Sequence, residues 1–467
     1  MENQAIIREL TDRARKAQAQ VAAYTQEQID RVCVAVAWEV YRDENIKLLA
    51  ETAVAETGMG NVADKIQKHK NKVLGVIDDV RKAKSVGLAE WDKEKGIRKF
   101  FKPVGVIGAL TPVTNPTATP SSNAVSILKG RNAVIFSPHP TAKNSTKLAV
   151  DMMRKGLDKV GAPADLIQVI EEPSLDLTAE LMKQVDLVVA TGGGPMVKSA
   201  YSSGTPAFGV GPGNSCQIIA EDADIADAAQ KIRVSKAFDN ATSCSSENSI
   251  VVQDSVYDSM IAQLKLEGGY LVQGEERNKL LETMWVPNKK GHLAINAKIV
   301  ARSAKAIAAM AGFTVPENTV MLLVEGSMPL EEDLFAEEKL SPVLTIWRYG
   351  KFEEGVSILT RLTNHSGRGH SCGIHTFNEE YIQYLGEHMQ TSRIMVRQPQ
   401  ASANGGNFTN GMPSTTTLGC GTWGNNITTE NITYKHFLNL TWLSEPIAAH
   451  RPTDEEVFGA YLKETQQ

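Results

Sequence analysis

The chain has 467 residues, 42% of them hydrophobic and 22% charged, so it can bury a sizeable core and is too long for one compact domain. Its 49 basic and 54 acidic side chains give a formal net charge of −5, without the clustered basic excess that nucleic-acid binding needs. No apolar run approaches the roughly 20 residues of a membrane span, and five irregularly spaced cysteines argue against a disulfide framework. We therefore expect a soluble, cytoplasmic protein that binds neither nucleic acid nor membrane.

The first hundred residues have helical periodicity. Apolar residues three and four apart predict helices over residues 5–23, 26–41 and 46–56. Two lysine-rich runs, 65–72 and 93–102, alternate with acidic or apolar residues. We interpret both runs first as solvated faces, and only second as a site for a phosphate-bearing ligand.

Short apolar runs broken by Gly and Pro begin near residue 100 and alternate with helical stretches. This alternation predicts a parallel, doubly wound sheet. The predicted strands are 104–110, 133–137, 166–170, 186–190 and 216–219, and the predicted helices are 123–129, 145–160, 176–185 and 196–202.

A second α/β set begins near Ala226. Its predicted helices are 225–238 and 256–267, and its predicted strands are 249–253, 319–324, 343–349, 372–377 and 393–397, followed by a strand-like run at 437–443. We therefore predict an α/β protein with two doubly wound domains and a small β element. The nucleotide-binding domain is expected at 1–226, the catalytic domain at 227–420, and the C-terminal strand and tail at 421–467.

One cysteine lies where packing does not explain it. Cys244 stands in a polar stretch, 239–247, between a predicted helix and a predicted strand. Hydroxyl groups and backbone donors around a loop thiol can stabilise its thiolate, so we predict that Cys244 is a nucleophile. Cys33, Cys216 and Cys372 lie within helix or strand patterns, where a free cysteine is usually a small buried hydrophobe.

A rigid loop follows the predicted strand 104–110. Asn115 stands in the run Thr-Pro-Val-Thr-Asn-Pro-Thr at 111–117, and proline fixes its own φ and restricts the residue before it. A fixed side-chain amide at a strand end can serve in an oxyanion hole. A turn Asn that caps the next helix is the alternative interpretation.

Two glycine-rich segments can bring the backbone close to other groups. Residues 187–195 read as strand, glycine turn and helix, an order that can seat a diphosphate at Gly192 and Gly193, although an ordinary tight turn fits as well. Residues 209–214 are followed by a strand rather than a helix, so we interpret them as a close-approach loop.

A metal site is not expected. His370 and Cys372 would share one face of a strand, whereas His375 would point to the other face. No second pair of ligands with zinc spacing accompanies them in the sequence, so the three residues do not make a zinc motif.

From about residue 5 to residue 446 the sequence resembles the CoA-acylating branch of the aldehyde dehydrogenase superfamily. The order of several motifs makes the resemblance specific. These motifs are residues 56–60, 114–117, 136–140, 190–195, 209–214, 240–247, 338–342 and 418–424.

The resemblance implies a role for each matching residue. Cys244 would add to the aldehyde, and Asn115 with the Cys244 N–H would hold the resulting oxyanion. NAD or NADP would be bound by Ser137 and His139 near the adenosine ribose, Gly192 and Gly193 at the diphosphate, and Glu338 at the nicotinamide ribose. Pro140 stands where many NAD-specific relatives have a ribose-binding glutamate, which leaves NADP possible.

The resemblance also implies coenzyme A as a co-substrate. Hydrolytic relatives carry a glutamate before Leu-Gly-Gly that activates water, whereas residues 209–213 here read Gly-Val-Gly-Pro-Gly. Without that base, attack by water should be slow, and the thiol of coenzyme A can compete for the acyl group.

The residues beside the nucleophile indicate a small anionic aldehyde. Thr242, Ser243 and Ser245 offer hydroxyl donors that suit an anionic tail, although they could merely cap the loop, and Arg368 is a candidate cation that could equally be a surface residue. The stretch 238–249 is similar to that of acylating sulfoacetaldehyde dehydrogenases, so sulfoacetaldehyde is the favoured substrate. Succinate semialdehyde or another short aldehyde is the alternative.

Two other classes of function remain open at this stage. One is a non-acylating dehydrogenase, and the other is a catalytically silent structural oligomer, against which the joint presence of Cys244, Asn115 and Glu338 argues. The resemblance implies a homodimer or homotetramer, in which the run 437–443 would extend the sheet of a partner.

Overall fold

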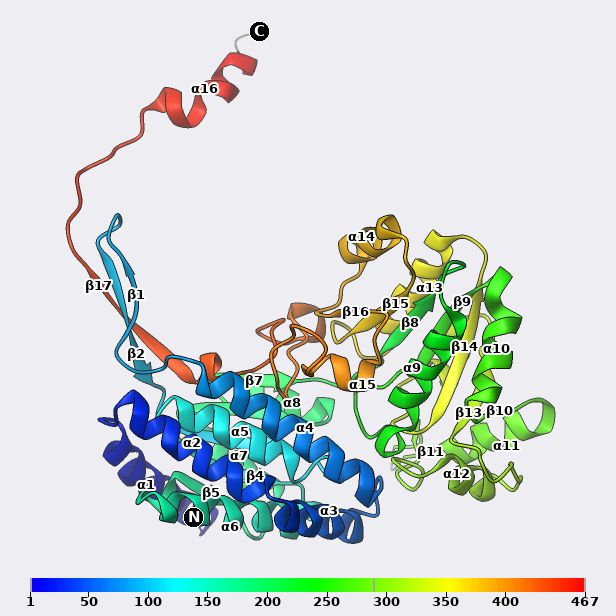
Figure 1. The fold of residues 1–467 in the computed structure, drawn as a ribbon, viewed down its shortest axis with the longest axis horizontal. Helices are drawn as coiled ribbons and strands as arrows, with labels where there is room; N and C mark the ends of the chain where they lie inside the picture. The colour runs from blue at the N-terminus through cyan, green and yellow to red at the C-terminus, as the bar shows by residue number, and fades with distance from the viewer. Residues whose placement is uncertain (1, 289, 466–467) are drawn as a thin grey trace.

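The chain forms two α/β bodies and a projecting arm in the computed structural model, which describes residues 2–288 and 290–465 (Figure 1). The first body contains a parallel five-stranded sheet in the order β5-β4-β3-β6-β7. Its strands are β3 (Val106–Thr111), β4 (Ala133–Pro138), β5 (Ile167–Val169), β6 (Leu187–Thr191) and β7 (Ala207–Val210).

Helices cover this sheet. The sequence analysis predicted all of them except the helix over residues 62–81, and its predicted helices 46–56 and 123–129 are shorter than the observed ones. The second helix begins at Gln26 with a capping box between Thr25 and Gln28 and ends at Tyr41, as the sequence predicts. The helices of the first body are α1 (Glu2–Val21), α2 (Gln26–Tyr41), α3 (Asp43–Thr57), α4 (Val62–Arg81), α5 (Ala118–Lys129), α6 (Lys143–Lys159), α7 (Leu175–Gln184) and α8 (Gly194–Tyr201).

The second body contains a parallel seven-stranded sheet in the order β10-β13-β14-β9-β8-β15-β16. Its strands are β8 (Cys216–Ile219), β9 (Ser249–Gln253), β10 (Gly269–Leu271), β13 (Met321–Glu325), β14 (Val343–Tyr349), β15 (Cys372–His375) and β16 (Ile394–Val396). Its helices include α9 (Ile225–Ala237), α10 (Tyr257–Leu266), α11 (Gly274–Met284), α12 (Ala304–Met310), α13 (Phe352–His365) and α14 (Glu379–His388), and a small hairpin, β11 (Trp285–Pro287) with β12 (Leu293–Ile295), lies beside them.

The predicted boundary at residue 226 is wrong. Strand β8 hydrogen-bonds to β9 and β15, so it belongs to the second sheet, and the chain crosses between the bodies within residues 211–215. The periodicity of β8 gives no sign of this change, because a buried parallel strand reads the same in either sheet.

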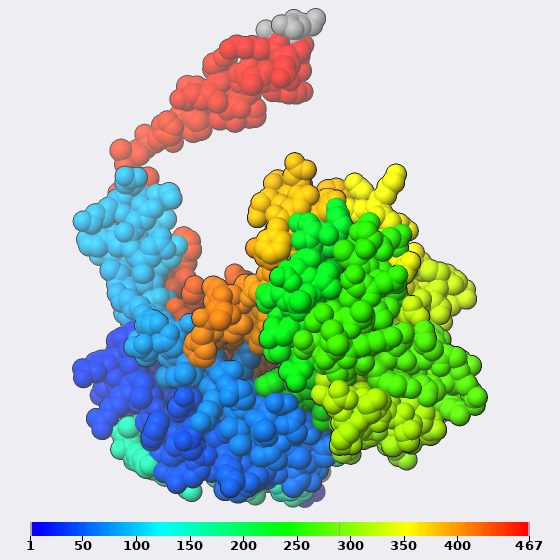
Figure 2. All heavy atoms as spheres, turned by 45° about the vertical axis from the view of Figure 1, so that its right-hand side comes forward, coloured from blue at the N-terminus to red at the C-terminus, as the bar shows by residue number. Residues whose placement is uncertain are grey.

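An antiparallel three-stranded sheet forms the arm, which projects from the first body (Figures 1 and 2). It joins β1 (Leu88–Asp92) and β2 (Ile97–Pro103), which the sequence analysis missed, to the predicted C-terminal strand β17 (Leu438–Ser444). A tail continues from β17 to α16 (Asp454–Thr465). None of the described helices is long and apolar enough to cross a membrane.

Candidate functional site

A cavity of about 840 Å³ draws its walls from both bodies. It collects every residue that the sequence analysis assigned to the nucleophile, oxyanion, cofactor or substrate, with the exception of Arg368. The predicted residues that line it are Asn115, Ser137, His139, Pro140, Gly192, Gly193, Thr242, Ser243, Cys244, Ser245 and Glu338.

The topology of the first sheet explains one wall of this cavity. Strand β3 pairs with β4 on one side and β6 on the other, so the strand order reverses beside β3, and a crevice opens at the carboxyl ends of such strands. The loop with Asn115 follows β3, while Gly192 and Gly193 join β6 to the N-terminus of α8. The predicted strand, glycine turn and helix are therefore confirmed.

Asn115 does not cap the helix that follows it. The N-cap residue of α5 is Thr117, and no side chain caps that helix end. The capping alternative for Asn115 is therefore excluded, whereas its place in the cavity wall agrees with a role beside Cys244.

Cys244 lies on a strained connection between α9 and β9. Three consecutive residues before it, Asp239, Asn240 and Ala241, have φ values of 50°, 52° and 59°, in the left-handed region that non-glycine residues rarely occupy. Each such residue costs on the order of 1–3 kcal/mol and persists only where its surroundings hold it.

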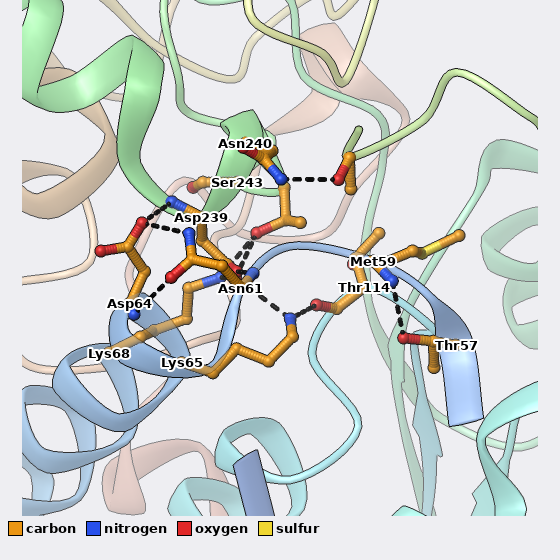
Figure 3. A network of polar contacts seen from close by, with 12 residues as sticks. Thr57, Met59, Asn61, Asp64, Lys65, Lys68, Thr114, Asp239, Asn240 and Ser243 are labelled. Atoms are coloured by element: carbon orange, nitrogen blue, oxygen red, sulfur yellow. Dashed lines mark hydrogen bonds and ion pairs between the residues drawn. The ribbon is translucent and has the colours of Figure 1, made fainter. Parts of the chain in front are cut away.

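The carboxylate of Asp239 provides that hold (Figure 3). It accepts the backbone N–H of Asn61 at 3.0 Å, while the N–H of Asp239 donates to Asp64 at 2.7 Å. A side chain at Gly60 would place its Cβ 1.8 Å from the Asp239 carboxylate, so the predicted motif 56–60 contributes a glycine that lets this carboxylate approach.

His370 contacts Cys244, the predicted nucleophile, and the sequence analysis did not predict this contact. The Nε2 atom of His370 lies 3.1 Å from Sγ of Cys244, and its Nδ1 atom lies 2.8 Å from Oγ of Ser371. Among the described residues no group of three or more His, Cys, Asp or Glu side chains is arranged to hold a metal ion. Because Cys244 and His370 are 126 positions apart in the chain, no local pattern joins them.

Burial keeps both members of this pair neutral at neutral pH. Burial and the nearby Glu338 raise the pKa of the Cys244 thiol to about 12, against the opposing charge of Arg393. Burial and the same Arg393 lower the pKa of His370 to about 3. A neutral imidazole and a neutral thiol can share a hydrogen bond, and the distance of 3.1 Å between Nε2 and Sγ fits one.

Glu338 lines the same cavity as Cys244. Burial raises the pKa of its carboxyl to about 8, and its Oε1 atom accepts the N–H of Gly213 at 3.0 Å. A Cβ atom at Gly213 would lie 2.0 Å from the carbonyl oxygen of Cys244, so only glycine fits there. The close-approach interpretation of residues 209–214 is confirmed.

The lysine-rich run 65–72 is not a solvated face, so that prediction is wrong. It lies on α4, whose side chains Lys65 and Lys68 are only 6% and 12% exposed and both pair with Asp239, at 3.1 and 2.5 Å (Figure 3). Lys68 and Lys72 line the cavity. Packing of α4 against the loop that contains Asp239 buries these charges, and the alternating pattern of the run does not encode this packing.

Arg368 lies outside the cavity. Its guanidinium donates to the side chain of Gln390 at 2.7 Å in an exposed position, and Arg368 is not among the described residues that line the cavity. The geometry does not support its predicted role as the cation for an anionic substrate.

A cysteine and a glycine turn at a helix N-terminus line one cavity between two α/β bodies, and this combination indicates the class of the protein. The profile of the aldehyde dehydrogenase family matches residues 1–419, and the chain belongs to that family.

The chain is also similar to individual members of this family. The chain is 64% identical over 97% of its length to a sulfoacetaldehyde dehydrogenase from Acholeplasma sp, of which the match covers 94%. It is 58% identical over 98% of both chains to a sulfoacetaldehyde dehydrogenase (acylating) from Bilophila wadsworthia. The crystal structure of an acetylating aldehyde dehydrogenase from Geobacillus thermoglucosidasius is similar at 36% identity with a TM-score of 0.92, covering 97% of this chain and 99% of that one.

Proposed function

We propose that the chain is a CoA-acylating aldehyde dehydrogenase that interconverts sulfoacetaldehyde, CoA and NAD(P)+ with sulfoacetyl-CoA and NAD(P)H. The observation that carries the proposal is the contact of 3.1 Å between Cys244 and His370 at a cavity lined by the cofactor-type glycine turn. The similarity to two sulfoacetaldehyde dehydrogenases along nearly the whole chain supports the choice of aldehyde.

The reaction begins at the pair of Cys244 and His370. His370 accepts the thiol proton while the sulfur adds to the aldehyde carbon, which forms a hemithioacetal. The side-chain amide of Asn115 and the N–H of Cys244 stabilise the oxyanion of this adduct. Loss of hydride from the adduct leaves a thioester on Cys244.

The cavity suits a nicotinamide dinucleotide. Gly192 and Gly193 stand at the N-terminus of α8, and a Cβ atom at either would meet nothing closer than 3.8 Å, so backbone donors there are open to a diphosphate. Ser137, His139 and Pro140 would face the adenosine ribose, and Glu338 the nicotinamide ribose. When bound, the cofactor supplies the acceptor for the hydride. Since Pro140 carries no carboxylate, we infer that a 2′-phosphate is tolerated and that NADP is used besides NAD.

The acyl group passes to coenzyme A rather than to water. Among the described residues that line the cavity, Glu338 is the one carboxylate, and its pKa of about 8 leaves it largely protonated at neutral pH. A protonated carboxyl cannot activate water, so the thioester on Cys244 survives until a thiol replaces the enzyme as acyl carrier. The presence of this chemistry argues against a silent structural role.

The protein is expected to act as a homodimer or homotetramer. Strand β17 lies at the edge of the arm sheet, and its Leu440, Trp442 and Leu443 side chains are exposed. An unpaired strand edge with apolar side chains is suited to pairing with another copy of the chain.

The first experiment follows NAD(P)H formation with CoA and, in turn, sulfoacetaldehyde, succinate semialdehyde and acetaldehyde. Sulfoacetaldehyde should give the highest kcat/KM, and only when CoA is present. Cys244→Ala should abolish turnover, and His370→Asn should lower kcat by about 100-fold or more through loss of the base. Turnover that does not need CoA would overturn the acylating assignment, whereas a better aldehyde would overturn only the choice of substrate.

A further inference from the structure

The face of α4 that lines the cavity carries two ammonium groups. Lys68 and Lys72 are four residues apart, so they lie on the same side of the helix, about one turn from each other. Gln67 and Asn71 extend the same polar strip along the cavity wall. The strip faces the polar residues Thr242 and Ser243 that precede the nucleophile.

Each of these ammonium groups keeps a donor for a ligand. Lys68 donates to the carboxylate of Asp239 at 2.5 Å and to the hydroxyl of Thr242 at 2.7 Å. Lys72 donates to the carbonyl oxygens of Gly405 and Gly406 at 2.9 and 3.2 Å. An ammonium has three N–H donors, so one remains on each lysine beyond these contacts with described residues.

The charge of the cluster is not balanced. Lys65 and Lys68 share the one carboxylate of Asp239. Among the described residues that line the cavity, Glu338 has the one carboxyl group, and it is largely protonated at neutral pH. Lys72 is held by backbone carbonyls alone among the contacts described, and these neutralise no charge. An uncompensated cation in a partly desolvated wall is unfavourable unless an anion enters the cavity.

The position of the lysines suits the tail of a short aldehyde. Thr242, to which Lys68 donates, is two residues from Cys244. Lys72 and Cys244 line the same cavity. A sulfonate one methylene from the carbonyl carbon could therefore meet these lysines while the carbonyl carbon meets Cys244.

We propose that Lys68 and Lys72 of α4 form the anion-binding subsite of this enzyme and hold the sulfonate of sulfoacetaldehyde. The inference rests on the proposed function, and it names the residues that select an aldehyde with an anionic tail. The remaining N–H of each lysine donates to a sulfonate oxygen. The hydroxyl groups of Thr242 and Ser243 line the cavity beside the two lysines. Lys65 does not line the cavity and serves instead as a second cation for Asp239.

The test measures selectivity rather than activity alone. For Lys72→Met, the ratio of kcat/KM for sulfoacetaldehyde to kcat/KM for propanal should fall by about 10- to 100-fold, because a charge-assisted hydrogen bond and a cation are lost. Lys72→Arg should recover part of the ratio. Lys70→Met is the matched control on the same helix, since Lys70 pairs with Asp43 and does not line the cavity, and it should keep the wild-type ratio.

Lys68→Met should lower the ratio as well, but it also breaks the contact with Asp239. If that variant does not fold, a second measurement replaces it. This measurement compares the inhibition constant of ethanesulfonate, a competitive inhibitor, between the wild type and Lys72→Met. The expected result is an inhibition constant raised about 10-fold or more in the variant. A folded Lys72→Met enzyme with the wild-type ratio and inhibition constant would overturn the inference. Failure of the wild type to use sulfoacetaldehyde at all would instead overturn the proposed function.

Discussion

Two lysine-rich runs that look alike in the sequence lie in opposite environments. On α4, Lys65 and Lys68 are buried around one carboxylate beside the nucleophile loop. On the arm, Lys93 lies over the ring of Trp91 at 4.9 Å, and Lys95 pairs with Asp92 at 3.3 Å with 72% of its side chain exposed.

The difference shows what determines whether a lysine side chain is buried or exposed. A buried ammonium is costly unless a partner compensates it, and Asp239, more than 160 residues away in the chain, compensates the lysines of α4. Lys93 and Lys95 of the arm use neighbours on the same small sheet and remain exposed to water, where an ion pair is worth about 0–1 kcal/mol. Composition and local pattern do not distinguish the two cases.

The largest expected effect comes from removing the shared carboxylate. Asp239→Asn leaves Lys65 and Lys68 buried without a counter-charge, which should cost about 3–5 kcal/mol in the free energy of unfolding. The strained loop before Cys244 should also loosen, so kcat should fall. Thermal unfolding and steady-state kinetics measure both effects.

Asp78→Asn is the matched control for that variant. Asp78 lies on the same helix and pairs with Arg81 and Lys82 at the surface, so its loss should leave the unfolding midpoint close to that of the wild type. Equal losses in the two variants would contradict the distinction between the buried and exposed clusters.

A moderate effect is expected from pH. Burial, together with Lys68, lowers the pKa of Lys72 to about 8, so this lysine is charged below that pH and neutral above it. The ratio of kcat/KM for sulfoacetaldehyde to kcat/KM for acetaldehyde should be constant well below pH 8 and fall by up to about tenfold per pH unit above it. Because other groups of the site act on both aldehydes, the ratio isolates recognition of the anion. A ratio that stays flat through this range would count against Lys72.

The smallest effect is expected on the arm. Lys99 pairs with Glu90 at 2.7 Å and lies 4.2 Å from the ring centroid of Trp442, and it is not among the described residues that line the cavity. Lys99→Met should change kcat/KM by less than about twofold. Light scattering on the same sample reports whether the arm sets the oligomeric state, and a tenfold loss of kcat/KM would show that the arm acts on the cavity.

Much of this protein follows from its sequence. Hydrophobic periodicity predicts most strands of both parallel sheets and the helix 26–41, because core burial imposes those patterns locally. The sequence also reveals the polar loop of Cys244 and the glycine turn at Gly192 and Gly193. Each of these features needs a particular residue type at a particular point of the chain.

Tertiary structure decided the rest. The contact of His370 with Cys244, the membership of β8 in the second sheet and the pairing of β17 with β2 all join segments that are distant in the chain. The burial of Lys68 likewise depends on Asp239, a partner that its own neighbours do not reveal. A side chain's neighbours along the chain specify its local conformation, whereas its charge state and its chemical role depend on the groups that folding brings against it.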